Sequence, residues 1–486
     1  MRLACILLVV AACGDGAHVR IGSKKFTESV ILGDAATELM QQAGIEVEHR
    51  RELGGTTILW DALRAGELDA YVEYTGTIAD ELLAGAGIDP TDDAALRTAL
   101  RARGVEMSRP LGFSDTYALG MRADEAARLG ITTISDLRAH PELVLAFSHE
   151  FLDRKEGWGS LRSRYGLPQQ DPTGMEHELA YRGLLAGSVQ VTDLYSTDAE
   201  IDAGHLRVLV DDLHHFPDYR AVWLYRSDLD ARAVAQLDRM AGAITTAEMI
   251  RANARARVDG EPEPAVAADL LARTLGARVS AAVPGRASRI WTHTREHLGM
   301  VAVSMLLATL VSIPLGVIAA RRRRIGAAIL AVVGLIQTLP SFALLVFMIP
   351  VLGIGWTPAV AALFLYSLLP IVRNTAQGIA GIAPSLRESA EALGLGPWAR
   401  LRLVELPLAT PAIVAGLKTA AVINVGTATL GALIGAGGYG QPILTGIRLD
   451  DRATILEGAI PAAALAILVQ VGFGLIERWL ARRAAP

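Results

Sequence analysis

The hydrophobic positions divide the chain into two parts. From residue 298 onward, the stretches 298–320, 325–372 and 458–476 contain no charged side chain, and 419–449 contains a single one, Arg448. A helix needs about 20 apolar residues to cross a bilayer. The 48-residue stretch 325–372 is long enough for two spans joined by a turn at 353–358. The pattern therefore predicts an all-α membrane domain of five transmembrane helices.

Before residue 276 the pattern alternates between strand-like and helix-like segments. Residues 18–21 and 69–74 are strand candidates, while 27–43 and 56–65 are helix candidates. We expect Thr27 to cap the first helix and two glycines to lead into the second. Such alternation predicts an α/β fold with largely parallel sheets, and its length favours two lobes that close by hinging.

The charges separate along the same division. Residues 284–486 hold 17 Lys and Arg against 8 Asp and Glu, a net charge of +9. Subtracting these from the totals of 46 and 51 leaves 29 basic and 43 acidic residues before them, a net charge of −14. Neither part has the basic patches with interleaved aromatics that nucleic-acid binding requires. We therefore expect two different domains and no nucleic-acid partner.

The positions of the arginines predict the orientation in the membrane. If Arg321 to Arg324 face the cytoplasm, then eleven of the arginines that follow the first span lie inside and only Arg448 and Arg452 lie outside. Cytoplasmic loops carry an excess of Lys and Arg. The rule thus predicts a multi-pass protein of the bacterial cytoplasmic membrane, with everything before residue 298 on the extracytoplasmic face.

The N-terminus has the features of an export signal. Arg2 precedes an apolar run of ten residues, which is too short to span a bilayer, and both cysteines lie within the first thirteen residues. Val10 to Cys13 resembles a lipoprotein signal, in which Cys13 would be acylated, although an ordinary signal peptide fits as well. Without further cysteines, no disulfide framework or cysteine-based metal site is expected downstream.

The long cytoplasmic loop at 388–407, ESAEALGLGPWARLRLVELP, resembles the coupling loop of ABC importer permeases. The resemblance implies a helix and a glycine turn that dock on a cytoplasmic ATPase; the alternative is an amphipathic helix on the membrane surface. The residues that match are Glu388, Ala390, Gly394, Val404, Leu406 and Pro407, with Ser389 in place of the usual alanine. The chain has no Gly-x-x-x-x-Gly-Lys-[Ser/Thr] motif, so a separate subunit must hydrolyse ATP.

Five segments of the first part resemble the binding proteins of osmoprotectant importers, which take up glycine betaine, choline or carnitine. They are 22–28 (GSKKFTE), 53–56 (LGGT), 71–77 (YVEYTGT), 114–119 (SDTYAL) and 195–198 (YSTD). The resemblance implies a fold like that of type II periplasmic binding proteins, and the second part resembles the matching type I permeases. It also implies a small quaternary ammonium ligand and no cofactor.

The resemblance places the two ends of such a ligand. A trimethylammonium group is held by aromatic faces through cation–π attraction, and a carboxylate by hydrogen-bond donors. The implied aromatic residues are Tyr74, Tyr117, Tyr195 and Tyr219; the implied carboxylate donors are Lys24, Thr77 and Arg154. We expect neither a catalytic residue nor a metal site.

Together these features predict a signal at 1–17, a binding domain at 18–275, a linker at 276–290 and a permease domain at 291–486. A permease of this kind works as a pair around one pathway, so a homodimer is expected. The alternative is a ligand-gated channel or sensor with a similar binding domain. Gly437 to Gly440 (GGYG) resembles a potassium-channel filter, but it follows a full span, which favours a glycine-rich loop.

Overall fold

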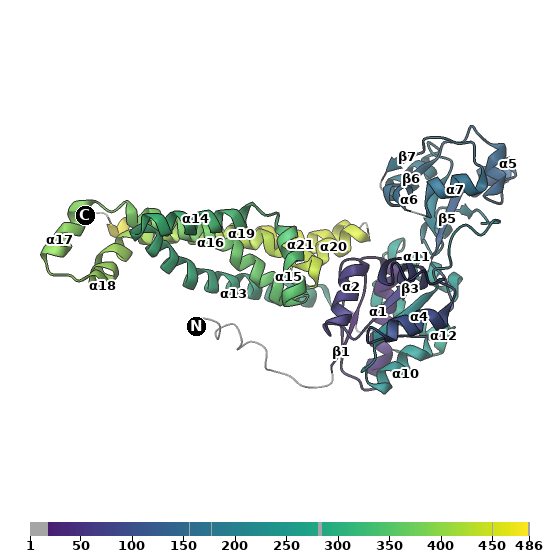
Figure 1. Ribbon diagram of the computed structural model, residues 1–486, viewed down its shortest axis with the longest axis horizontal. Helices are drawn as coiled ribbons and strands as arrows, with labels where there is room; N and C mark the ends of the chain where they lie inside the picture. Colours follow the sequence, from purple (N-terminus) through teal and green to yellow (C-terminus); the bar gives the residue numbers. More distant parts are fainter. Residues whose placement is uncertain (1–17, 155, 176, 280–283, 450, 485–486) are drawn as a thin grey trace. The chain divides into compact units, whose positions relative to one another are not determined.

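The computed structural model describes residues 18–154, 156–175, 177–279, 284–449 and 451–484. The chain forms two compact units that divide before Pro284 (Figure 1). The expected signal segment and its Cys13 lie outside the described residues.

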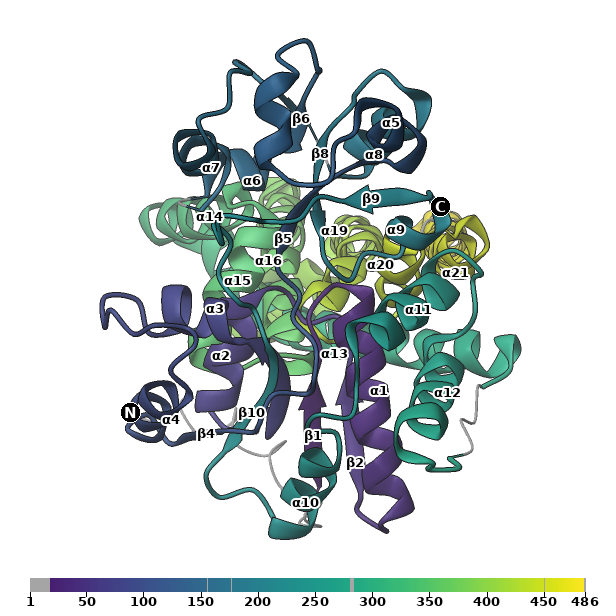
Figure 2. The ribbon, with the colours of Figure 1, turned by 90° about the vertical axis from the view of Figure 1, so that its right-hand side faces the viewer.

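The first unit has two lobes, each with its own sheet and core. The first lobe is built on a five-stranded sheet in the order β2-β1-β3-β10-β4. Its strands are β1 (Val19–Gly22), β2 (Val47–Arg50), β3 (Ala70–Tyr74), β4 (Val105–Met107) and β10 (Ala221–Arg226). Helices cover both faces of this sheet (Figure 2). They are α1 (Thr27–Gln42), α2 (Thr56–Arg64), α3 (Thr75–Thr77), α4 (Asp93–Arg101), α10 (Ala231–Arg239), α11 (Thr246–Arg257) and α12 (Glu263–Leu275).

The second lobe is smaller and holds a three-stranded sheet, β8-β5-β9, and a two-stranded one, β6-β7. Its strands are β5 (Tyr117–Arg122), β6 (Ala146–Ser148), β7 (Thr173–Met175), β8 (Thr192–Tyr195) and β9 (Leu206–Val208). Its helices are α5 (Ala123–Leu129), α6 (His149–Asp153), α7 (Trp158–Tyr165), α8 (His177–Ala186) and α9 (Glu200–Ala203). An aromatic core that includes Phe147, Phe151 and Trp158 fills this lobe.

Two chain segments cross between the lobes side by side. One runs from β4 to β5 and the other from β9 to β10, and they meet at an antiparallel bridge between Ser114 and Arg220. The Tyr219 amide donates to Ser114 Oγ at 3.0 Å, and the Asp115 amide donates to the Tyr219 carbonyl at 3.0 Å. A paired crossing of this kind is a suitable hinge.

Two expectations for this unit need correction. Among the strands that the structure describes, the parallel pairs are β1–β2, β1–β3 and β6–β7, whereas β5 and β10 pair antiparallel with both of their neighbours. Thr27 does not cap α1; the helix begins at Thr27, and Phe26 occupies the capping position without a side-chain cap. The bounds of β1, β3, α1 and α2 agree with the predicted segments to within about one residue.

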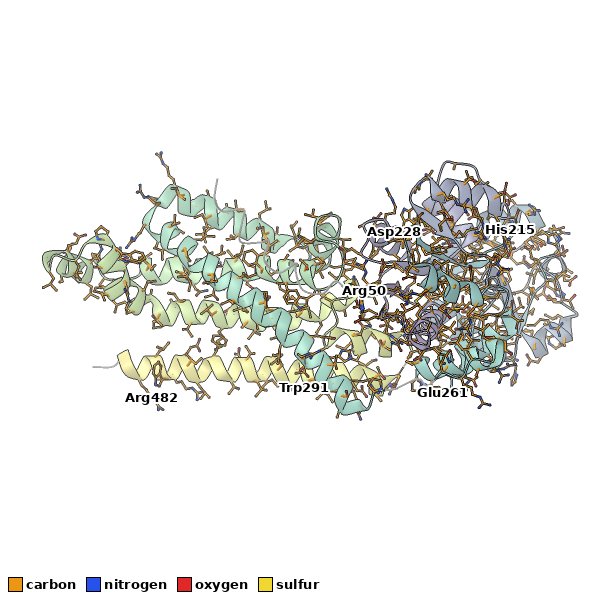
Figure 3. The ribbon with its side chains drawn as sticks, turned by 90° about the horizontal axis from the view of Figure 1, so that it is seen from below. Arg50, His215, Asp228, Glu261, Trp291 and Arg482 are labelled. Carbon is orange, nitrogen blue, oxygen red and sulfur yellow. The ribbon has the colours of Figure 1, made fainter. Side chains whose placement is uncertain are left out.

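The second unit is a bundle of helices. They are α13 (Arg286–Arg321), α14 (Arg323–Thr338), α15 (Ser341–Leu352), α16 (Trp356–Ala380), α17 (Pro384–Ala392), α18 (Pro397–Arg400), α19 (Leu406–Thr427), α20 (Gly440–Arg448) and α21 (Arg452–Ala484). Trp291 and Arg482 lie toward opposite ends of the bundle (Figure 3). The short helices α17 and α18 lie at the end at which α21 finishes (Figure 1).

Among the described residues, four helices are long and apolar enough to cross a membrane, or five if the bent pair α14 and α15 is one span. The pair bends by 101° between its two helices. The predicted stretch 419–449 is not one span, because α19 begins at Leu406 and ends at Thr427. Lys418 lies inside α19, where it pairs with Glu477 of α21 at 3.0 Å. That ion pair allows a charged residue within the helix.

Candidate functional site

Two of the predicted ligand tyrosines face each other in the second lobe. Tyr117 begins β5 and Tyr195 ends β8, and the antiparallel register places them directly opposite. Their ring centroids are 4.9 Å apart and their hydroxyl oxygens 3.1 Å apart. Directly opposed residues of an antiparallel pair have neighbouring side chains on the same face, so the strand register itself assembles this part of the site.

Further aromatic rings and one cation gather around Tyr117. The rings of Phe151 and Phe216 lie 5.3 and 6.5 Å from it, measured between centroids. The Arg154 guanidinium carbon lies 5.2 Å from the centre of the Tyr117 ring. A cation at this distance from an aromatic face is attracted by the ring quadrupole. The aromatic rings around Tyr117 thus form a place where a positive charge is favoured.

The other predicted ligand residues gather in the first lobe. Lys24 follows β1, Tyr74 ends β3, and Thr77 ends the short helix after β3. Because β1 and β3 are parallel neighbours, their carboxyl ends lie at the same edge of the sheet, where ligands bind in open α/β folds. Lys24 Nζ lies 5.8 Å from the centre of the Tyr74 ring.

Tyr219 packs closely against the loop that carries Thr77. A β-carbon added to Gly76 would lie 2.4 Å from Cε1 of Tyr219, so only glycine allows this approach. Burial raises the pKa of Tyr219 to about 12, and the nearby charge of Arg154 opposes that shift. Arg154 also reaches Glu81 of the first lobe, at 3.5 Å. Arg154 therefore connects the residues around Tyr117 in the second lobe with the residues of the first lobe.

The surroundings of Lys24 modify its predicted role. Its ammonium group forms a short ion pair with Glu73, whose side chain is fully buried, and donates to Thr56 Oγ1 at 3.0 Å. Burial raises the pKa of Glu73, and the charge of Lys24 opposes that rise. A lysine has three donors, so one remains for a ligand. Lys24 thus brings little net positive charge to this end of the site.

Two buried carboxylates were missed by the sequence reasoning, although both lie in quoted segments. Glu73 sits in β3, in which every residue is buried, and a charge in such a strand requires a partner. Glu28 in α1 accepts hydrogen bonds from the Tyr74 hydroxyl and from Asn253 Nδ2, the latter at 3.3 Å. Among the described residues, no cluster of His, Cys, Asp and Glu could hold a metal ion.

The predicted coupling residues form a projecting loop. Glu388, Gly394 and Pro407 are exposed, whereas Ala390 is buried and Leu406 half-buried. Gly394 has a φ of 78°, which favours glycine, and its added β-carbon would meet no atom within 4 Å. Leu393, Trp398 and Leu403 are 80, 73 and 62% exposed. Exposed apolar side chains of this size mark an interaction surface.

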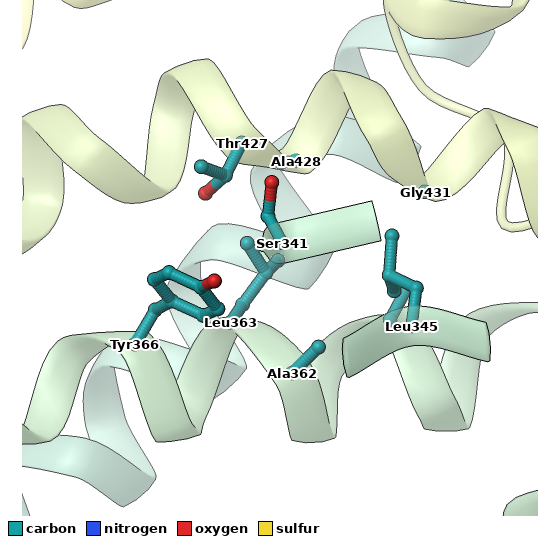
Figure 4. Close-up of a pocket in the computed structure, with 9 residues that line it drawn as sticks. Ser341, Leu345, Ala362, Leu363, Tyr366, Thr427, Ala428 and Gly431 are labelled. Carbon is teal, nitrogen blue, oxygen red and sulfur yellow. The ribbon is translucent and has the colours of Figure 1, made fainter. Parts of the chain in front are cut away.

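A small cavity also lies in the membrane unit, apart from the predicted ligand residues (Figure 4). It lies between α15, α16 and the end of α19, and among its lining residues are Ser341, Leu363, Tyr366 and Thr427. Tyr366 donates its hydroxyl proton to the Leu339 carbonyl. This bond ties α16 to the break between α14 and α15, where a carbonyl would otherwise lack a partner.

Comparison with known proteins agrees with both units. Residues 17–273 match the family described as the substrate binding domain of the ABC-type glycine betaine transport system, and 312–486 match the binding-protein-dependent transport system inner membrane component. The fold and site thus define a binding domain fused to a permease of an ABC-type transport system. The chain belongs to the glycine betaine transport substrate-binding family, joined to a permease domain of the inner membrane component family.

Named relatives match the membrane unit over most of their length. A choline transport system permease protein of Bacillus subtilis is 44% identical over 38% of this chain and 86% of its own. An osmoprotectant import permease protein of Salmonella typhimurium is 43% identical over 36% of this chain and 84% of its own. A solved structure titled as a glycine betaine/carnitine/choline ABC transporter is 27% identical, covers 52% of this chain and 98% of that chain, and has a TM-score of 0.48. A channel or sensor gains no support from these relatives.

Proposed function

We propose that this chain captures a small quaternary ammonium solute, such as glycine betaine, choline or carnitine, and passes it through the membrane as one subunit of an ATP-driven importer. The observation that carries the proposal is the aromatic group around Tyr117, with Tyr195, Phe151 and Phe216 beside it. A trimethylammonium group cannot donate a hydrogen bond, so ring faces are its best partners. Tyr74 and Tyr219 complete the aromatic box from the first lobe.

The carboxylate of a betaine would lie among the donors of the same pocket. Arg154, between the two lobes, is the main candidate, and Thr77 and the remaining donor of Lys24 assist it. Arg154 reaches both Tyr117 and Glu81, so a carboxylate bound there would join the lobes. Choline has no carboxylate and would use the aromatic box alone.

The importer requires partners and a membrane orientation that belong to this proposal. A separate cytoplasmic ATPase docks on the exposed loop around Gly394, and two copies of the chain line one pathway. The binding unit faces outward and the loop 388–407 inward. The exposed apolar side chains Leu393, Trp398 and Leu403 support such a docking role.

The aromatic box is tested by ligand binding to the full chain in lipid nanodiscs. Tyr117→Ala should weaken glycine betaine and choline together by roughly tenfold, within the range of cation–π contributions. Tyr117→Phe keeps the ring face and should bind almost normally. Tyr225→Ala, on half-buried Tyr225 of β10, is the matched control. Unchanged binding in Tyr117→Ala would refute the aromatic box.

The carboxylate end is tested by comparing the two ligands in one variant. Arg154→Gln should weaken glycine betaine by about 1.5–3 kcal/mol, the value of a hydrogen bond to a charged group, and should leave choline no weaker. Arg128→Gln is the control, since Arg128 lies on the same lobe with a side chain 67% exposed. Equal losses for both ligands would leave the aromatic box without a carboxylate end.

A further inference from the structure

An ion pair with a buried carboxylate joins the first span to the coupling loop. Arg321, the last residue of α13, places Nη2 at 2.7 Å from Oε2 of Glu405. Glu405 lies 84 residues further along the chain, at the end of the coupling loop, and its side chain is only 4% exposed. A buried carboxylate is costly unless it is paired. Arg321 therefore provides the charge that allows Glu405 to be buried.

The same carboxylate connects onward to the projecting part of the loop. Oε1 of Glu405 lies 3.3 Å from Nε of Arg400 in α18. Arg400 in turn forms a short ion pair with Glu391 in α17. Arg321 Nη2 also approaches the carbonyl of Pro397 at 3.4 Å. These residues form a chain of alternating charges from the end of α13 through both helices of the loop.

The helix α13, to which these ion pairs attach the loop, is continuous. α13 runs for 36 residues from Arg286 to Arg321, which at the rise of an α-helix is about 54 Å. Its first turn is also fixed by charge: Arg289 and Arg286 reach Glu457 of α21 at 2.9 and 3.0 Å. The Glu457 side chain is 9% exposed. α13 is thus ion-paired at both ends.

We propose that Arg321 is a positioning residue for transport, which ties the coupling loop to α13 so that the loop and the first span move as one body. The inference rests on the proposed function, because it assumes that the loop docks on an ATPase. Movement of the loop would then be transmitted along α13, the helix that continues the chain from the binding unit.

A charge exchange tests this role with the full chain co-expressed with its ATPase. Arg321→Glu and Glu405→Arg should each reduce uptake of radiolabelled glycine betaine and choline by about tenfold or more, while the dissociation constants stay unchanged. The double exchange restores opposite charges and should recover uptake to within about threefold, the signature of a direct pair in a double-mutant cycle. Arg321→Lys keeps the charge and should retain more uptake than Arg321→Glu.

Arg322→Glu is the matched control. It makes the same change of charge one residue away, and in the described part of the chain Arg322 has no ion-pair partner. The inference is overturned if Arg321→Glu transports as well as Arg322→Glu. It is also overturned if the double variant Arg321→Glu with Glu405→Arg folds and binds ligand normally but does not recover uptake. A wild-type chain that binds or transports neither solute would instead count against the proposed function.

Discussion

Glu28 shows how a single buried carboxyl supports the proposed ligand site. It is 3% exposed and accepts the hydroxyl proton of Tyr74, so it holds that ring at the edge of the sheet. Burial raises the pKa of Glu28 to about 7, opposed by hydrogen bonds from Tyr74, Thr197 and Asn253. Burial also raises the pKa of Asp115 well above its usual value, and the nearby charge of Glu28 adds to that rise.

These shifts predict how the stability of the binding unit depends on pH. Between pH 4.5 and about 7 the folded state keeps the Glu28 proton that the unfolded state has lost. The contribution of Glu28 to the free energy of unfolding therefore falls as the pH rises through this window. Glu28 alone accounts for up to about 3 kcal/mol between pH 4 and pH 8.

Thermal unfolding of the full chain at pH 5 and pH 8, followed by tryptophan fluorescence, measures this dependence. Glu28→Gln should reduce the loss of stability at pH 8, because the amide stays neutral. Glu46→Gln is the control, since the Glu46 side chain is 73% exposed. A wild-type binding unit that is equally stable at both values would contradict the assignment.

At this scale, resemblance supplies the candidate residues for the site, but the sequence does not predict their partners. Tyr117 and Tyr195 were identified through resemblance, and only the strand register shows that they are opposite each other. Glu73 lies one residue before Tyr74, yet its pairing with Lys24 joins segments 49 residues apart. Contacts between distant segments depend on the packing of the whole lobe and leave no local pattern.

Among the elements, the coupling loop depends on the backbone of one glycine. α17 ends at Ala392, and Gly394 turns the chain with a φ of 78° before α18 begins at Pro397. This region costs residues with a β-carbon roughly 1–2 kcal/mol. The turn sets the direction in which Leu393 and Trp398 project.

Replacement of this glycine should affect transport and not capture. Gly394→Ala should lower uptake while ligand binding stays unchanged, and Gly394→Asn, which tolerates this conformation better, should retain more uptake. Gly396→Ala is the matched control, because Gly396 has an ordinary φ of −63° and equally open surroundings. Uptake by the purified importer in proteoliposomes decides between them; equal effects at both glycines would contradict a conformational role for Gly394.

The limits of hydropathy are visible in the same elements. The turn predicted at 353–358 is shorter in the structure: α15 ends at Leu352, Gly353 and Gly355 lie between the helices, and α16 already begins at Trp356. The break between α14 and α15 was not predicted, because Leu339 and Pro340 lie in an unbroken apolar run. The start of α19 was missed for the opposite reason: Lys418 interrupts the apolar run, and its partner Glu477 belongs to another span.

For the whole molecule, charge asymmetry and the arrangement of the bundle lead to one topology. α17 and α18 lie at the same end of the bundle as Arg482 (Figures 1 and 3). Both regions are rich in arginine, which favours the cytoplasmic side. Ten residues separate the end of α12 at Leu275 from the start of α13 at Arg286.

Reporter fusions test this topology directly. Fusions after Pro284 and after Gly355 should report the extracytoplasmic side, and fusions near Pro397 and after Pro486 the cytoplasmic side. The reason is that five crossings result when the bent pair α14–α15 is counted as one span beside α13, α16, α19 and α21; five is an odd number, so the two ends of the unit would lie on opposite sides. If the bent pair does not cross, every fusion beyond it changes sides, so the fusions at Gly355, Pro397 and Pro486 would all report results opposite to those expected. A cytoplasmic signal at Pro284 would place the binding unit inside the cell, where it could not capture an external solute, and would overturn the importer itself.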